Sequence, residues 1–150
     1  VLEASVRARQ DWHKEAVRTA YSGPDEEWRL TAVFCMRFLR GFEKQILESL
    51  KSNNPEIHYQ AVCAAGNWEV DKAWPHIARL VTSEETEKPL LLAAIEAAAT
   101  IRPGEASEIL GDLLDSPDED VADAVYEALA MAGALLDDED LEEDDDETIH

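Results

Sequence analysis

Hydrophobic residues recur along this chain at the spacing of a helix face. In residues 70–82 the apolar side chains lie three or four positions apart and so share one side of a helix; they are Val70, Trp74, Ile77, Leu80 and Val81. A half-buried strand would need an alternating run of β-branched residues, and none occurs. The pattern predicts an all-α fold.

Polar connectors interrupt the apolar stretches at a regular interval. They begin at Ser22, Ser52, Ser83 and Ser116, which are 30, 31 and 33 residues apart. Their Ser, Asn, Pro and Glu residues are typical of helix starts, and Ser116 with Glu119 fits a capping box. A period of this length indicates an array of repeats.

Each period holds two helical segments that are separated by a Gly or Pro turn. The first segment carries closely spaced alanines, as in residues 61–65 and 94–99, where two helices can pack closely. The second segment is more aliphatic, as in residues 46–50 and 77–81. The pattern predicts a helix–turn–helix unit of about 31 residues.

Residues 22–134 resemble the short HEAT-like repeats, including the type found in phycobilin lyases. The segments that match best are residues 52–56, 116–121 and 124–129, although the arginine that commonly follows the connector is absent. The resemblance implies a right-handed α-solenoid of about three and a half repeats, used mostly for protein–protein contact.

The two ends of the chain differ from the repeats. Residues 1–21 carry an apolar stripe and end before the first connector, so we expect an N-terminal capping helix or the end of a preceding repeat. Residues 137–147 contain 10 acidic side chains among 11, which predicts a disordered acidic tail over residues 137–150. The repeat domain is therefore expected to cover residues 1–136. The chain begins without Met, and we expect a processed product or part of a longer array.

The net charge of −21 lies wholly in the second half of the chain. Residues 1–82 hold 11 basic and 11 acidic side chains, whereas residues 83–150 hold 2 basic and 23 acidic ones. Binding to nucleic acid or to an anionic membrane surface depends on Lys and Arg, so the charge argues against both. It favours another protein with a basic segment as the partner.

The composition also bounds the cellular setting. The longest apolar runs are far shorter than the 18 or more residues of a membrane span. Two cysteines in 150 residues do not make a disulfide framework, which favours a reducing, cytoplasmic location.

No residue pattern predicts a catalytic or metal site. The four histidines are scattered, no Cys-x-x-Cys occurs, and Cys35 and Cys63 are interpreted as small buried hydrophobic residues. We expect no cofactor and no enzymatic activity, with weak Ca²⁺ or Mg²⁺ association of the acidic tail as the exception considered. Two alternatives stay open: an enzyme-associated HEAT-like module (lyase-like or metal-dependent), and a purely structural part of a larger solenoid.

The four tryptophans are interpreted mainly as packing residues. Trp12 and Trp28 fall on apolar stripes and are predicted to be core residues. Trp68 and Trp74 flank a predicted turn, where they either pack between repeats or form an exposed aromatic anchor.

The predicted partner-binding surface lies on the second helices, which line the concave face of such solenoids. Helical spacing places a mixed, mildly basic set on one of them and an acidic set on the next. These residues are Lys72, His76, Arg79, Glu105, Glu108, Asp112 and Asp115. An ordinary solvated face is the alternative interpretation.

The last alanine-rich helix lacks a second helix after it in the sequence pattern. Its apolar residues are therefore predicted to form an unsatisfied flank; they are Val121, Val125, Ala128, Leu129 and Leu136. A terminal repeat without a polar outer face tends to associate, so we expect weak self-association.

Overall fold

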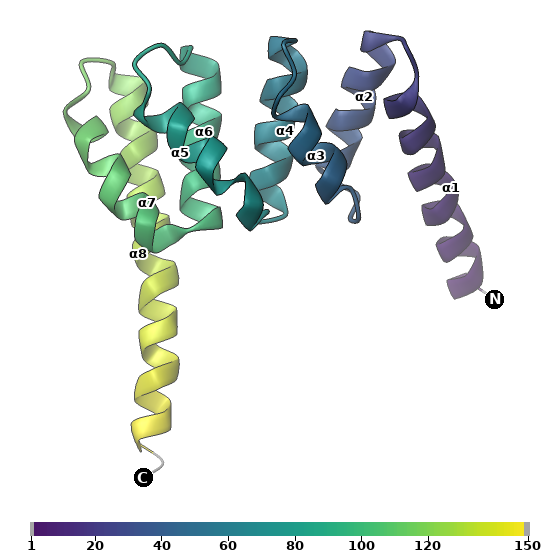
Figure 1. Cartoon of the computed structure of the whole chain (residues 1–150). Coiled ribbons are helices and arrows are strands. Elements are labelled where there is room, and N and C mark those ends of the chain that lie inside the picture. The colour runs from purple at the N-terminus through teal and green to yellow at the C-terminus, as the bar shows by residue number, and fades with distance from the viewer. Residues whose placement is uncertain (1, 149–150) are drawn as a thin grey trace. The chain divides into compact units, whose positions relative to one another are not determined.

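The computed structural model describes the backbone of residues 2–148 and the side chains of residues 12–133 (Figure 1). Helices are the only regular elements over residues 2–148, which confirms the all-α prediction. The α-helices are α1 (Leu2–Ser22), α2 (Glu26–Met36), α3 (Glu43–Ser49), α4 (Pro55–Asn67), α5 (Trp74–Thr82), α6 (Lys88–Ile101), α7 (Pro103–Leu110) and α8 (Glu119–Thr148). Two 3₁₀ helices, η1 (Asp71–Ala73) and η2 (Gly111–Asp115), precede α5 and follow α7.

The chain divides into two compact units, Val1–Trp68 and Glu69–His150. In the first unit α1 and α4 pack on α2, and α3 packs on α4. In the second unit α5, α7 and α8 pack on α6, and α7 with η2 also packs on α8 (Figure 1). Each second helix (α3, α5, α7) thus lies against the first helix that follows it, which is the stacking of an α-solenoid. The right-handed superhelix stays a prediction.

The core of both units is built on equivalent positions of the first helices. These are counted here from the residue before each helix: Asp25, Asn54, Glu87 and Asp118. The seventh residue after it is buried in all four helices, and three of the four are alanine; they are Ala32, Ala61, Ala94 and Val125. The second helices bury Ile46, Ile77 and Leu110, each six residues before a connector serine. The small residues on one helix and the branched residues on the other confirm the predicted division of roles.

Helices α4 and α8 are capped two residues after their connector serines. Ser52 Oγ accepts a hydrogen bond from the amide of Asn54 at 3.1 Å, and the Asn54 side chain then caps α4 through Glu56 N at 3.0 Å. Ser116 repeats the pattern: its Oγ accepts from Asp118 N at 3.2 Å. Asp118 in turn accepts from Asp120 N at 2.9 Å. The predicted Ser116–Glu119 capping box is therefore wrong, because the serine shapes the turn and Asp118 caps α8.

Helix α1 is joined to the first unit by a buried side chain and by hydrogen bonds. Val17 is buried, and the Tyr21 hydroxyl donates to Glu48 Oε2 at 3.0 Å on α3. Burial is the main cause that raises the pKa of the Tyr21 hydroxyl. Arg29 of α2 donates to the carbonyl oxygens of Tyr21 and Gly23 at 3.3 and 3.0 Å. These contacts hold the turn between α1 and α2.

Two tryptophans pack between repeats, as one of the two interpretations predicted. The indole Nε1 of Trp68, after α4, donates to the carbonyl of Met36, at the end of α2, at 2.7 Å. Trp74, at the start of α5, is buried, and the guanidinium of Arg102 lies over its ring at 5.6 Å from the centroid.

Helix α8 extends beyond the repeat region. Its backbone is helical from Glu119 to Thr148, and so includes most of the segment that was expected to be a disordered tail. The side chains of residues 134–150 lie outside the described residues, and the tail and the domain boundary at residue 136 stay predictions. Over the part of the chain that is described, no helix is long and apolar enough to cross a membrane.

Candidate interaction surface

The residues predicted to bind a partner lie in one unit, on η1, α5, α7 and η2. Helices α5 and α7 contact each other, so the two sets are neighbours. Lys72 and Arg79 are exposed, as are the four acidic residues, whereas His76 is half-buried. The structure therefore places the two predicted sets on adjacent elements. Whether this surface binds a partner stays a prediction.

The sequence of α5 explains which side chains reach the surface. Pro75 occupies the first turn, where its missing N–H costs no helical hydrogen bond. Trp74, Ile77 and Val81 are buried, at the three- and four-residue spacing of one helix face. Arg79 lies off this face and is exposed.

Helix α7 follows the same rule with acidic residues on its exposed side. Pro103 occupies its first turn, and Ala106 and Leu110, four residues apart, are buried. Glu105 and Glu108 are exposed on α7, and the acidic side continues on η2 with the exposed Asp112 and Asp115.

Arg102 neutralises one of the four predicted acidic residues. Its Nε and Nη2 donate to the two carboxylate oxygens of Asp71 at 2.7 and 3.0 Å, and its Nη1 donates to both oxygens of Glu105 at 3.2 Å. The hydrogen bond from Arg102 is the largest cause that lowers the pKa of Asp71, and the same bond raises that of Arg102. Glu105 therefore belongs to an internal ion-pair network that joins η1 to α7.

Lys88, at the start of α6, also forms ion pairs within the chain. Its Nζ lies 2.7 Å from Asp120 Oδ2 and 3.1 Å from Asp118 Oδ2, at the start of α8. Hydrogen bonding to Asp120 is the first cause that raises the pKa of Lys88, and hydrogen bonding from Lys88 lowers that of Asp118. Lys88 and Arg102 are the two basic residues after residue 82, so both are used within the chain.

The remaining carboxylates of α7 and η2 are exposed without such a partner. Glu108, Asp112 and Asp115 form no ion pair with any described residue. Exposed acidic side chains also occur on the first helices, for example Glu96 on α6 and Glu127 on α8. The negative charge therefore covers more of this unit than the predicted surface alone.

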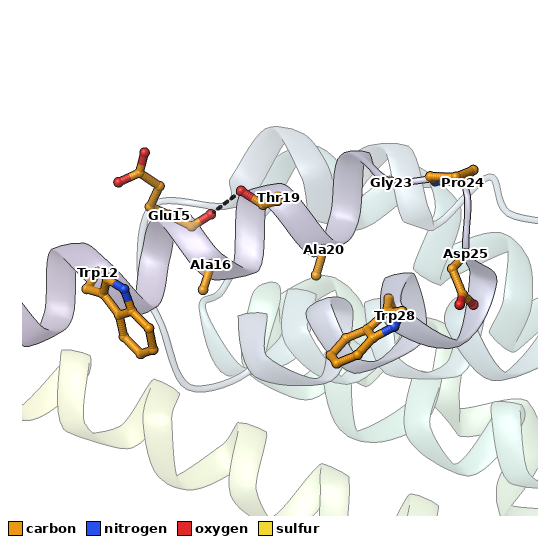
Figure 2. A pocket seen from close by; sticks show the side chains of 9 residues that line it. All are labelled: Trp12, Glu15, Ala16, Thr19, Ala20, Gly23, Pro24, Asp25 and Trp28. Atoms are coloured by element: carbon orange, nitrogen blue, oxygen red, sulfur yellow. Dashed lines mark hydrogen bonds between the residues drawn. The ribbon is translucent and has the colours of Figure 1, made fainter.

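The prediction that Trp12 and Trp28 are core residues is wrong. Trp12 on α1 is 67% exposed and Trp28 on α2 is 62% exposed. They point to the same side of their helices and flank a groove of about 610 Å³, with Ala16 and Ala20 between them (Figure 2). Of the apolar stripe predicted on α1, Trp12 and Ala16 line this groove, whereas Val17 is buried.

The predicted apolar flank of α8 is also corrected. Val121, Val125 and Ala128 are buried, because this side of α8 packs on α6 and α7. Leu129 is half-buried, and Leu136 lies outside the described residues. The large exposed hydrophobic side chains on the described part of α8 are instead Tyr126 and Met131. The sequence pattern identified the packed stripe of α8 and missed its exposed one.

The two cysteines are less deeply buried than the sequence predicted. Cys35 and Cys63 are half-buried, where the sequence predicted buried ones. No group of three or more His, Cys, Asp or Glu side chains that could hold a metal ion occurs within residues 12–133.

Comparison with known proteins adds one match. The family model described as HEAT repeats matches residues 43–130, from the first residue of α3 into α8. No curated protein matches the chain.

Proposed function

The chain belongs to the HEAT repeat family, and from this premise we propose that it is a non-catalytic scaffold that binds another protein. Repeats of this family generally act as protein-interaction scaffolds. Within this role, the exposed carboxylates of α7 and η2 bind a basic segment of the partner. The predicted setting of this interaction is cytoplasmic.

A basic partner is supported because the two Lys and Arg residues after residue 82 both form ion pairs within the chain. Lys88 and Arg102 are held by ion pairs, so the carboxylates of Glu108, Asp112 and Asp115 depend on cations from elsewhere. A lysine- or arginine-rich segment supplies them. Lys72 and Arg79 on the neighbouring α5 are exposed and would repel such a segment, which confines it to the α7 side.

The strength of this interaction follows from its exposure. An exposed ion pair contributes only about 0.2–1 kcal/mol, so several carboxylates must act together. Binding is then moderate in affinity, fast, and weakened as salt rises toward physiological concentration.

The test uses a lysine/arginine-rich peptide with a fluorescent label and a neutral peptide of the same length. The charge-reversed double variant Glu108→Lys, Asp112→Lys should lose binding to the basic peptide. The control is Glu96→Lys, Glu127→Lys, which makes the same change of net charge on α6 and α8. Equal losses in both double variants would mean that only net charge matters, and a loss in the control alone would move the site to the first helices. Either result rejects the proposed surface.

The alternative roles have less support. An enzyme-associated module needs a metal site or an activated nucleophile, and no observation on the described residues favours either. A purely structural part of a larger solenoid would bind neither peptide.

A further inference from the structure

The third residue of the first helices is buried in α4 and α8, half-buried in α6, where it is Leu90, and exposed in α2. Ile57 in α4 is 1% exposed and Val121 in α8 is 4% exposed, whereas Trp28 in α2 is 62% exposed. Helix α4 packs on α2, and α8 packs on α6, so each has an earlier first helix beside it. No earlier first helix precedes α2 within residues 2–148. Trp28 therefore marks a face where another first helix fits.

The eighth residue shows the opposite exception, in α8. Val33, Val62 and Ile95 are fully buried at this position, and Tyr126 is 72% exposed. The other first helices are followed by a second helix, and no second helix follows α8 within residues 2–148. Tyr126 marks a face where another second helix fits.

Helix α1 is a second helix by its contacts and by its register. It packs on α2 as α7 packs on α8. Six residues before the connector serine, where α3, α5 and α7 bury Ile or Leu, α1 carries Ala16, which is exposed. Ala16 forms part of the groove between Trp12 and Trp28 (Figure 2). Ala16 therefore leaves space in the groove that Ile or Leu fills in the internal repeats. Helix α8 carries the large exposed side chain of Tyr126, which can fill this space.

We propose that α8 of one copy packs into the groove between α1 and α2 of a second copy. Together α8 and α1 then form one complete helix pair, a first helix followed by a second helix. The aromatic ring of Tyr126 compensates in volume for Ala16, since a well-packed interface needs complementary large and small residues. This inference does not depend on the basic partner proposed above.

The contact joins two different faces and is therefore head-to-tail, so it adds copies one after another without closing as a symmetric dimer does. Charge opposes it at low salt, because the chain carries a net charge of −21 and both helix starts are acidic, with Glu26 and Glu27 in α2 and Glu119 and Asp120 in α8. Screening removes most of this repulsion at about 0.5 M salt, where the Debye length is below about 5 Å. Self-association should therefore be weak and should rise with salt.

The test is analytical ultracentrifugation of the 150-residue chain over a wide concentration range at low and high salt. Trp28→Lys and Tyr126→Lys should each weaken self-association by about tenfold or more, because each places a charge at an aromatic anchor of the contact. Both residues are mostly exposed, so neither change should unfold the chain. Phe38→Lys is the matched control, an exposed aromatic residue outside the groove, and should associate as the unchanged chain does.

Mixing the two variants separates this contact from a symmetric one. The Trp28→Lys chain keeps its Tyr126 face and the Tyr126→Lys chain keeps its groove, so an equimolar mixture should form a 1:1 dimer and nothing larger. A chain that stays monomeric at high concentration and high salt would overturn the proposal. So would a mixture that stays monomeric, or self-association that only one of the two substitutions weakens.

Discussion

Arg102 binds the carboxylate of Asp71 with two hydrogen bonds, Nε to Oδ1 at 2.7 Å and Nη2 to Oδ2 at 3.0 Å. The two residues are 31 positions apart, one repeat period, and Arg102 also lies over the ring of Trp74. The planar guanidinium thus links the start of one second helix to the start of the next. An arginine suits this place because its fork geometry matches a carboxylate and its flat face stacks on an aromatic ring.

Removing either partner of this pair should destabilise the second unit. Arg102→Met and Asp71→Asn should each lower the melting temperature, Arg102→Met by more because it also loses the contacts with Glu105 and Trp74. The double variant should fall little below Arg102→Met, because that variant already lacks the interaction with Asp71. Arg102 lowers the pKa of Asp71, so the contribution is present above the ordinary pKa of an aspartate and is lost as pH falls through the lowered value. Additive losses in the double variant would mean that the two side chains act independently.

Gly41 adopts a backbone conformation that favours glycine. Its φ is +96°, and no atom lies within 4 Å of the place where a Cβ would stand. Gly41→Ala should therefore lower the free energy of unfolding by about 1–2 kcal/mol through backbone strain alone. Gly111→Ala is the control, since Gly111 also has open space but a φ of −53°, and it should be neutral or stabilising by up to about 1 kcal/mol. Urea unfolding of both variants measures the difference, and equal effects would argue against strain at Gly41.

His58 should make the stability of the chain sensitive to pH near neutrality. Burial lowers the pKa of the His58 imidazole in the folded state. The unfolded chain then binds more protons just below about pH 6.5, so wild-type stability decreases as pH falls through this range. His58→Gln lacks this term, and the stability difference between wild type and variant should be more favourable to wild type at pH 7.5 than at pH 5.5. His13→Gln, at an exposed position, is the control, and an unchanged difference for His58→Gln across this pH range would refute the assignment.

The repeat pattern could be predicted from the sequence because it depends on local chemistry. The connector at Ser52 to Glu56 contains a cap, a proline and an acidic first turn, and α4 begins at Pro55 with Asn54 as its cap. The alanines at positions such as Ala61 and Ala94 occupy the buried face of the first helices, as their spacing indicates. Helix existence and type follow directly from such signals.

The exposure of Trp12 and Trp28 could not be predicted from an apolar stripe alone. A stripe shows that a face is apolar, but its burial depends on which helix lies beside it. Trp28 occupies the same register as Ile57 and Val121, which are buried, so a large apolar residue suits this position. It is exposed because no first helix precedes α2 within residues 2–148. Aligning the repeats by their caps, and asking which end helix lacks a neighbour, is the signal that identifies it.

The acidic surface was predicted in position but not in detail. Helical spacing placed Glu105, Glu108 and Asp112 on the exposed side of α7 and η2, where they lie. The ion pair between Glu105 and Arg102 involves a residue in the turn before α7, and helical spacing does not describe side-chain positions in a turn.

Several hydrogen bonds and ion pairs between repeats join residues about one period apart. Separations in sequence are 28 residues for Asn54 with Glu26, 32 for Trp68 with Met36, 31 for Arg102 with Asp71 and 32 for Lys88 with Asp120. A gain or loss of one whole period therefore preserves the distance along the chain between such partners, and the entropy of closing each loop stays the same. A short insertion within one period changes the distance along the chain between these partners. Descendants of this sequence are accordingly freer to change the number of their repeats than the length of any one repeat.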